Sequence, residues 1–240
     1  MNILITGGAS GLGAAITRLL AENIDNTIYF TYNGSYVNAL KIEEDLKNTN
    51  SVKCNFKDAN ELGLLVDKIK RLDLDILVNN AYGGDISPIH FHKISPDKFL
   101  SDFNDNIIPT IKITQEVIRN FRKKKQGKII TVLTSYLANI PPMGLSTYIA
   151  NKAYLEKLTK VWASENTKFN ISSNSISPSF MQTGLTEDVD ERIIDQMILN
   201  HPQKRLLTVI EAAEAVDFLV NTSSQINGVD ILMNAGINIK

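Results

Sequence analysis

The sequence has almost no cysteine, no excess of charge of either sign and no long hydrophobic run. Its one cysteine, Cys54, excludes an intramolecular disulfide and fits a reducing compartment. The 25 basic and 26 acidic side chains nearly cancel, whereas nucleic-acid and membrane-surface proteins usually carry a basic excess. No uncharged apolar run reaches the ~18 residues of a membrane span. We therefore expect a cytoplasmic protein without signal peptide, nucleic-acid partner or membrane partner, and we interpret Cys54 as structural.

Short apolar runs alternate with longer segments of helical spacing along the whole chain. Runs rich in β-branched and aromatic residues, such as TIYFTY, favour strands. We expect strands at 2–6, 27–32, 51–56, 74–80, 128–135, 171–177 and 229–234, and helices at 12–22, 36–47, 60–71, 97–122, 147–166, 188–199 and 209–220. This alternation predicts a doubly wound α/β fold, in which helices cover both faces of a parallel sheet. No linker or repeat interrupts it, so we expect one domain over 1–240.

The segment TGGASGLG at 6–13 lies between the first expected strand and the first expected helix. Glycines at such a junction allow a tight turn and let backbone N–H groups approach a pyrophosphate at the positive end of the helix. The spacing of Gly7, Gly11 and Gly13 is G-x-x-x-G-x-G, which differs from the usual G-x-G-x-x-G. A plain turn would also use these glycines, but the strand-then-helix context favours a dinucleotide-binding loop.

Tyr148 and Lys152 lie four residues apart in STYIANKAYL, within an expected helix. One helical turn places both side chains on the same face. Free tyrosine and lysine titrate near ~10 and ~10.4, so neither is an obvious acid–base catalyst at neutral pH. Taken alone, the pair is either a surface feature or a proton-transfer device.

These motifs, in this order, resemble those of the short-chain dehydrogenase/reductase family. TGGASGLG is similar to the family's T-G-x-x-x-G-(I/L)-G, NNAY at 79–82 to N-N-A-G, and Ser135 with Tyr148 and Lys152 to S…Y-x-x-x-K. NSISPSFMQT and INGVDILMNAG resemble the two later motifs. The resemblance spans nearly the whole chain and implies a single Rossmann-type domain of about seven parallel strands. In this chain Tyr82 and Ser179 replace glycines of the family pattern.

The resemblance implies hydride transfer between a nicotinamide and a carbonyl or alcohol carbon. Tyr148 would act as general acid in reduction, and the charge of Lys152 would lower the pKa of that phenol. Ser135 would hold the substrate oxygen. Thr134 could take this place if the motif slips by one residue, but spacing to Tyr148 favours Ser135. Asn106 matches the family's asparagine that anchors a water beside the lysine; a helix-surface amide is the other interpretation.

The resemblance also implies where a dinucleotide binds. Backbone groups of Asn80 and Ala81 would line it, and Thr183 would bond its carboxamide. The pair Asn55-Phe56 matches residues that touch the adenine. The full set expected at the cofactor is Gly7, Ala9, Ser10, Gly11, Leu12, Gly13, Tyr32, Asn33, Ser35, Asn55, Phe56, Asn80, Ala81, Tyr82, Tyr148, Lys152, Pro178 and Thr183.

The end of the second expected strand bears on the choice of dinucleotide. An acidic residue there normally binds the ribose 2′-hydroxyl and selects NAD. This chain has no acid in the segment 31–35, and Tyr32, Asn33 and Ser35 could hydrogen-bond a 2′-phosphate. No Arg or Lys stands there either, and Ser10 occupies a place where NADP-preferring relatives often carry Arg. We expect NADP(H) to be favoured over NAD(H).

No metal site is expected, because His90 and His92 have no third ligand near them in sequence. The segment of about 180–201 is expected to cover the substrate, and its apolar residues suit an apolar or acyl-like molecule, although helix packing explains them equally well.

Three functions are compatible with these features. The first is a carbonyl reductase, most similar overall to 3-oxoacyl-(acyl-carrier-protein) reductases. The second is an alcohol or sugar dehydrogenase working in the oxidative direction, and the third is a non-catalytic dinucleotide sensor. A sensor has no need of the complete catalytic set, so we expect an enzyme. The resemblance also implies a homotetramer or homodimer built through the helices at 97–122 and 147–166.

Overall fold

The computed structural model describes residues 1–83, 88–138, 140–186 and 188–237. Seven parallel strands form one sheet in the order β3-β2-β1-β4-β5-β6-β7. The strands are β1 Asn2–Ile5, β2 Thr27–Tyr32, β3 Thr49–Lys53, β4 Ile76–Asn79, β5 Gly127–Val132, β6 Ile171–Pro178 and β7 Asp230–Met233. The expected doubly wound parallel sheet is confirmed.

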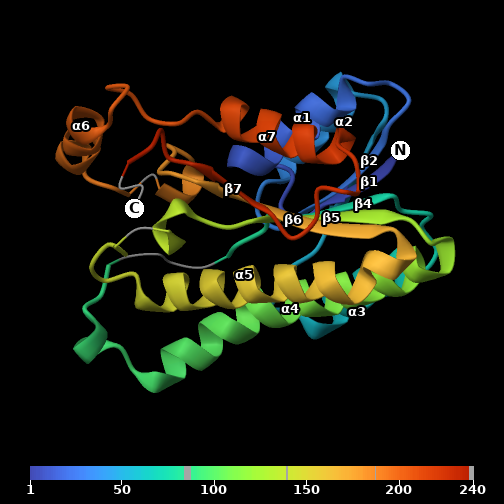
Figure 1. The fold of residues 1–240 in the computed structure, drawn as a ribbon, viewed down its shortest axis with the longest axis horizontal. Helices are drawn as coiled ribbons and strands as arrows, with labels where there is room; N and C mark the ends of the chain where they lie inside the picture. The colour runs from blue at the N-terminus through green and yellow to red at the C-terminus, as the bar shows by residue number, and fades with distance from the viewer. Residues whose placement is uncertain (84–87, 139, 187, 238–240) are drawn as a thin grey trace.

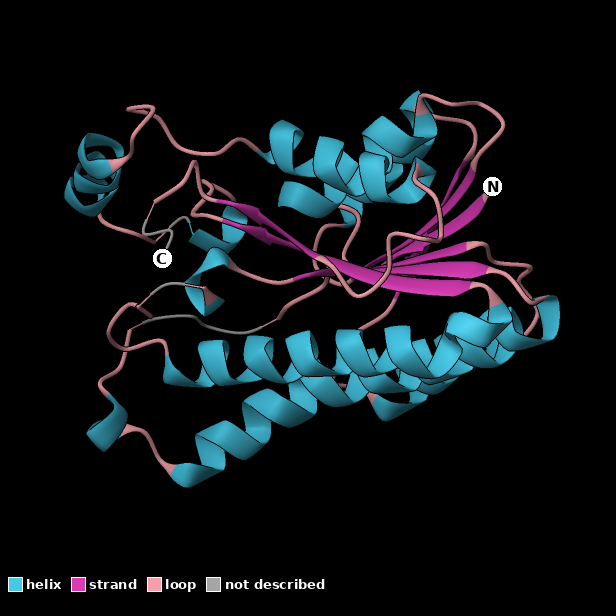
Figure 2. Cartoon of the chain, viewed as in Figure 1, coloured by secondary structure: helices cyan, strands magenta, loops and turns pink. Residues whose placement is uncertain are grey.

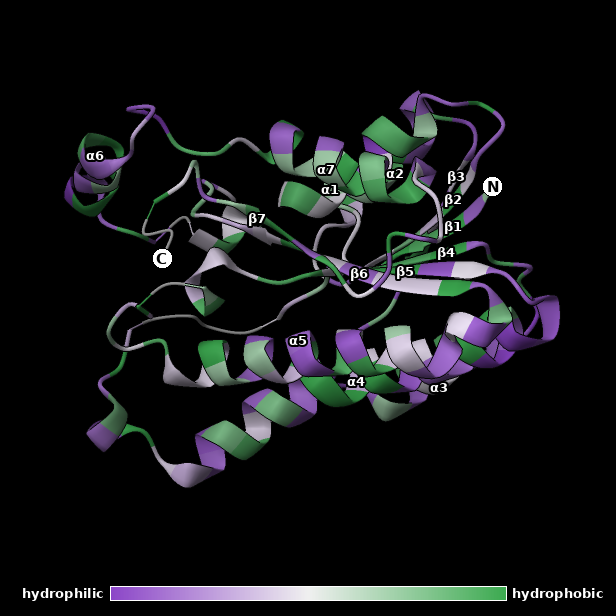
Figure 3. Cartoon of the chain, in the orientation of Figure 1, coloured by the Kyte–Doolittle hydropathy of each residue, from purple (hydrophilic) through white to green (hydrophobic). Residues whose placement is uncertain are grey.

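Helices cover both faces of this sheet (Figure 1). One face carries α1 Gly11–Ala21, α2 Tyr36–Asp45 and α7 Val209–Asn221, and the other carries α3 Ala59–Ile69, α4 Pro96–Lys124 and α5 Ser146–Asn166. The sixth helix, α6 Glu191–Asn200, lies apart from the sheet. Figure 3 shows hydrophobic residues along α1 and α7, which pack against each other on the first face.

The core is divided between the two faces by the alternation of side chains along each strand. In β1, Ile3 and Ile5 pack with α1 and α7, whereas Leu4 between them packs with α3 and α4. All three are at most 1% exposed. A parallel strand buried on both faces needs such a continuous apolar run, and this explains why ILI is apolar without a break.

Two strands end earlier than the sequence pattern suggests, because side chains turn the backbone. Thr134, two residues after β5, accepts a hydrogen bond from the Tyr136 amide (3.4 Å) and caps the short helix Ser135–Leu137. After β3, the Asp58 carboxylate accepts from the first amides of α3. Of the residues expected at the ends of these strands, Ser135 therefore begins a short helix and Asn55 lies in a loop.

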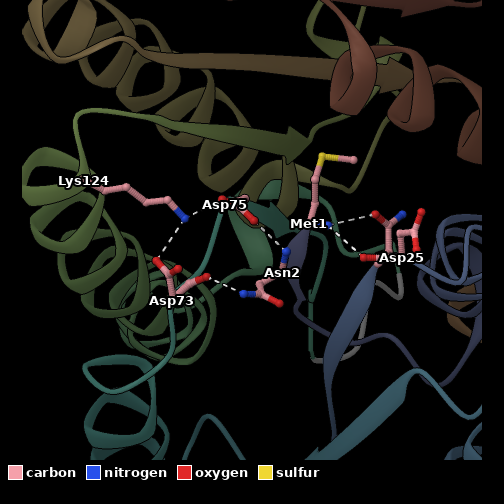
Figure 4. Close-up of polar contacts among 7 residues, drawn as sticks. Met1, Asn2, Asp25, Asp73, Asp75 and Lys124 are labelled. Atoms are coloured by element: carbon pink, nitrogen blue, oxygen red, sulfur yellow. Dashed lines mark hydrogen bonds and ion pairs between the residues drawn. The ribbon is translucent and has the colours of Figure 1, made fainter.

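At the amino end of the sheet, polar contacts join the start of β1 to the turn before β4 (Figure 4). Asp75 accepts from the Asn2 amide at 2.7 Å and from Lys124 at the end of α4 at 2.5 Å. Burial raises the pKa of this carboxyl, but the bonds from Lys124 and Asn2 outweigh it and leave the pKa lowered. These contacts fasten the end of the sheet opposite to the candidate site.

Candidate active site

The carboxyl ends of β1, β4 and β5 are neighbours, so the segments that follow them meet at one edge of the sheet. Figure 2 shows the loops gathering at this edge, on the side where α6 lies. The chain order reverses between β1 and β4, and ligands of doubly wound sheets bind at such a reversal. The glycine loop, the NNAY segment and the Thr134–Ser135 pair all stand here.

The glycine loop is fastened on both sides. The Gly7 amide donates to the Thr31 hydroxyl (2.9 Å) on β2, and the Asn80 side chain donates to the Thr6 carbonyl (2.9 Å). The Thr6 hydroxyl in turn accepts from the amides of Asn80 and Ala81, both at 3.0 Å. The loop and the NNAY segment therefore form one connected unit. Thr6 was not among the residues expected at the cofactor.

Three glycines of this loop are required by its geometry. Gly7 and Gly11 have φ of +68° and +50°, which L side chains rarely adopt. A Cβ on Gly13 would lie 2.0 Å from the Gly7 carbonyl oxygen. Ser10 makes no side-chain cap to α1, so it leaves the first amides of that helix to another acceptor. A backbone this compact at a helix start fits the approach of a pyrophosphate.

The other expected cofactor residues lie along the same edge. A Cβ on Gly11 would come within 3.3 Å of Thr183, so the segment after Pro178 returns to the glycine loop. Tyr32 ends β2, and Asn55 follows the neighbouring strand β3. These two places are on the far side of β1 from the Tyr148 site, where the adenosine half of an extended dinucleotide would lie.

Cys54 is buried beside these residues, and burial, together with Glu61 and Asp58, raises the pKa of its thiol to about 12. A thiol this reluctant to ionise is a poor nucleophile, in agreement with the structural interpretation.

Helix α5 brings Tyr148 and Lys152 to the end of β5. Lys152 is 4% exposed, and its ammonium donates to the Val132 carbonyl at 2.7 Å. Burial lowers the pKa of Lys152 to about 8. Its Nζ atom lies 5.9 Å from the centroid of the Tyr148 ring.

The pKa of Tyr148 differs from the sequence-based expectation. Burial raises it to about 12, while a hydrogen bond with the Thr134 side chain lowers it and Tyr136 raises it. The expected lowering by Lys152 is not among these causes, because the ammonium points to the Val132 carbonyl. A pKa raised in this way favours the protonated phenol at neutral pH.

Both hydroxyls after β5 are buried, Thr134 at 4% and Ser135 at 3% exposure. Thr134 is extended and its hydroxyl accepts from the Tyr136 amide, whereas Ser135 is the first residue of the short helix. Of the two side chains, that of Thr134 is the one that lowers the pKa of Tyr148. The structure is therefore compatible with Thr134 in the role expected for Ser135.

Asn106 lies in α4, close to the NNAY segment. Its side-chain oxygen accepts from the Gly83 amide (2.7 Å), and its amide nitrogen donates to the Asp102 carbonyl (3.0 Å). The Asn106 carbonyl accepts from the Thr110 hydroxyl at 2.8 Å. Asn106 therefore holds the backbone next to Tyr82, and its role as a water anchor stays a prediction.

Tyr82, which replaces the family glycine, lies against Tyr148 and Lys152. Its ring meets that of Tyr148 edge to face, with centroids 5.1 Å apart and planes at 83°. The Lys152 ammonium lies over the Tyr82 ring, 5.1 Å from the centroid. The sequence motif predicts Tyr82 near the cofactor, but it does not predict this contact with both Tyr148 and Lys152.

The segment 180–201 contains a short helix, Gly184–Thr186, and α6. The Thr186 hydroxyl accepts from the Thr183 amide and donates to the Met181 carbonyl, both at 2.9 Å. On α6, Ile194 is buried, while Leu199 is 66% exposed. That the segment 180–201 covers the substrate stays a prediction.

Within the described ranges, no group of three or more His, Cys, Asp or Glu side chains could hold a metal. The same residues include no helix with the length and hydropathy needed to span a bilayer.

The chain belongs to the short chain dehydrogenase family, whose model matches residues 1–193. It is therefore a nicotinamide-dependent oxidoreductase.

Similar proteins cover the chain almost from end to end. It is 32% identical over 241 residues to a 3-oxoacyl-(acyl-carrier-protein) reductase of Buchnera aphidicola, covering 98% of this chain and 96% of the relative. The crystal structure of a Brucella melitensis 3-ketoacyl-(acyl-carrier-protein) reductase complexed with NADH superposes with a TM-score of 0.87 at 23% identity, over 99% and 98% of the two chains. A gluconate 5-dehydrogenase of Burkholderia cenocepacia, in complex with NADP and tartrate, gives 0.85 at 22% identity over 98% and 94%. The two structures share the fold.

Proposed function

We propose that the protein reduces a ketone of the 3-oxoacyl type to a secondary alcohol. The observation that carries this proposal is the Tyr148 phenol, held protonated beside the Thr134 hydroxyl and the Lys152 ammonium at the carboxyl edge of the sheet. The named activity of the 32% identical relative supports the 3-oxoacyl class.

The reaction needs one hydride and one proton. The dinucleotide, when bound, supplies the hydride to the carbonyl carbon. Tyr148 gives its phenolic proton to the carbonyl oxygen, which becomes the new hydroxyl. A hydroxyl of the Thr134–Ser135 pair donates to the same oxygen and stabilises the negative charge that develops there. The Lys152 ammonium donates to the Val132 carbonyl, and from 5.9 Å its positive charge would favour the phenolate that remains on Tyr148.

The dinucleotide would be held by the glycine loop, the Asn80–Ala81 backbone and Thr183, and we propose that it is NADP(H). In the structure Asn33 is exposed and Ser35 half-buried at the end of β2, and Ser35 makes no capping bond to α2. Polar side chains without an acid would accept a 2′-phosphate. Michaelis constants for NADPH and NADH test this choice, and a lower value for NADH would overturn it.

The proposed activity is tested by following NADPH consumption with a panel of 3-oxoacyl thioesters, β-keto esters, simple ketones and quinones. We expect the highest kcat/KM with a 3-oxoacyl thioester. Faster turnover of a sugar or simple alcohol with the oxidised dinucleotide would favour the oxidative dehydrogenase instead.

The Thr134–Ser135 pair gives a prediction that separates the two hydroxyls. Because Thr134 bonds Tyr148, we expect Thr134→Ala to lower kcat by roughly a hundredfold, as the loss of an oxyanion donor does. Thr134→Ser should retain most of the activity, and Ser135→Ala should cost much less than Thr134→Ala. Steady-state kinetics of the three variants decides between them. A larger loss of kcat in Ser135→Ala than in Thr134→Ala would assign the hydrogen bond to the substrate oxygen to Ser135 instead.

A homodimer or homotetramer and a cytoplasmic location remain part of the proposal. Helices α4 and α5 carry exposed apolar residues, among them Leu100 at 63% and Val161 at 42% exposure, which a second copy could cover. Light scattering on the purified protein measures the number of copies, and a monomer would contradict this part.

A further inference from the structure

We propose that Tyr82 is a positioning residue, whose ring holds the Lys152 ammonium and the Tyr148 ring in their working places. This inference rests on the proposed function and adds to it a residue that the family motif, with glycine here, does not supply.

The first support is the arrangement of the three side chains. The Tyr82 ring contacts Tyr148 edge to face at 5.1 Å, and Lys152 lies over the same ring at 5.1 Å from its centroid. Edge-to-face pairs and cation–π contacts are both attractive, and the second is strongest where the cation is desolvated. Lys152 is 4% exposed, so its charge is desolvated. One aromatic ring thus contacts both members of the catalytic pair.

The second support is the fixed backbone around Tyr82. The Ala81 amide donates to the Thr6 hydroxyl at 3.0 Å, and the Gly83 amide donates to the Asn106 side chain at 2.7 Å. The residues on both sides of Tyr82 are therefore hydrogen-bonded, one to Thr6 just after β1 and the other to Asn106 in α4. With its backbone fixed on both sides, the Tyr82 ring has a defined position against the Lys152 ammonium.

The third support is the chemistry of the Tyr82 hydroxyl. Burial raises its pKa to about 12; the Asn151 side chain nearby lowers this pKa, and Asp102 and Tyr148 raise it. The phenol is therefore neutral at working pH and acts through its ring. Asn151, which is 5% exposed, has no hydrogen-bond partner for its buried side-chain nitrogen among the described residues.

The groups around Lys152 come from several elements. Val132 of β5 offers its carbonyl, α5 contributes Tyr148, and the segment after β4 contributes Tyr82. Farther out, Tyr136 of the short helix acts on Tyr148, and Asp102 of α4 acts on Tyr82. In the described part of the chain, burial lowers the pKa of Lys152 and no carboxylate raises it. The aromatic face therefore opposes a burial cost that no carboxylate offsets.

The inference predicts a change in pH dependence. The proposed role of Lys152 needs its positive charge, so kcat for carbonyl reduction falls as the pH rises through the pKa of Lys152. Removing the ring removes an attraction to the charged form and lowers that pKa, and the alkaline fall of kcat then begins at lower pH. The strength of a desolvated cation–π contact corresponds to a shift of roughly half to one and a half pH units.

Three variants separate the ring from the hydroxyl. We expect Tyr82→Phe to keep the wild-type pH profile of kcat, and Tyr82→Leu and Tyr82→Gly to shift the alkaline limb down by roughly half a unit or more. A Tyr82→Leu profile that superimposes on the wild type would overturn the inference, as would a Tyr82→Phe profile that shifts equally.

A second measurement does not depend on turnover. NMR titration of the lysine side chains in protein labelled with carbon-13 lysine, with Lys152 assigned from its arginine variant, gives the pKa of Lys152 directly. A lower Lys152 pKa in Tyr82→Leu and an unchanged one in Tyr82→Phe supports the inference even if no substrate of the panel is reduced. Equal pKa values in all three proteins refute it while leaving the proposed reduction intact.

Discussion

Replacing Tyr148 by phenylalanine is expected to lower kcat for carbonyl reduction by roughly two to four orders of magnitude, the usual contribution of a positioned acid. The substitution keeps the ring that meets Tyr82 edge to face and removes the proton that the new hydroxyl needs. The free energy of unfolding should change little, because the lost hydrogen bond to Thr134 contributes only about 1 kcal/mol. Steady-state kinetics and thermal melting measure the two effects.

Tyr154→Phe is the matched control, because Tyr154 lies on the same helix, is 44% exposed and packs against Phe103. We expect this variant to retain wild-type kcat. Wild-type turnover by Tyr148→Phe would contradict the proposed proton transfer.

Gly13→Ala should be the most damaging single-methyl change in the glycine loop. The new Cβ would lie 2.0 Å from the Gly7 carbonyl oxygen and 2.6 Å from the Asn80 side-chain nitrogen. A backbone oxygen cannot yield without moving the loop, so we expect dinucleotide affinity to fall roughly a hundredfold. The overpacking should also reduce the free energy of unfolding by about 1–3 kcal/mol. Fluorescence titration with NADPH and denaturant unfolding measure these losses.

Gly63→Ala provides the control for the added methyl group. Gly63 lies inside α3, and a Cβ there meets nothing within 4 Å. Because alanine is a better helix former, we expect a gain of about 0.5–1 kcal/mol in the free energy of unfolding and unchanged NADPH binding. Wild-type affinity in Gly13→Ala would show that the dinucleotide does not depend on this loop.

Much of the fold could be predicted because local and global signals agree. The apolar run at 3–5 is buried on both faces, and Gly7 and Gly11, which follow it, stand where a turn requires positive φ. The strand ends were less predictable. KIITVLTS has a continuous strand pattern, yet β5 ends at Val132, because the Thr134 hydroxyl captures the Tyr136 amide and starts a helical turn. This hydrogen bond depends on the local backbone geometry, which the pattern of apolar residues does not reveal.

For the candidate site, the sequence predicted which residues lie close together better than it predicted their pKa values. Spacing within a helix brings Tyr148 and Lys152 to one face, as expected. The direction of the Lys152 ammonium depends on its hydrogen bond to the Val132 carbonyl, which is distant in sequence. The effect of Lys152 on the pKa of the Tyr148 phenol depends on the same bond. The motif identified Tyr82 as unusual, but the place of its ring follows from Asn106 holding Gly83 across the fold. Long-range contacts of this kind are invisible in a single sequence.

The most direct test of the account follows a label from the dinucleotide to the product. The purified protein is mixed with a 3-oxoacyl thioester and NADPH that carries deuterium at the transferable position. The account predicts one molecule of 3-hydroxyacyl thioester for each NADPH oxidised, with deuterium on the carbinol carbon. Binding of NADPH without reduction of any carbonyl in the panel, or a product that lacks the label, would contradict it.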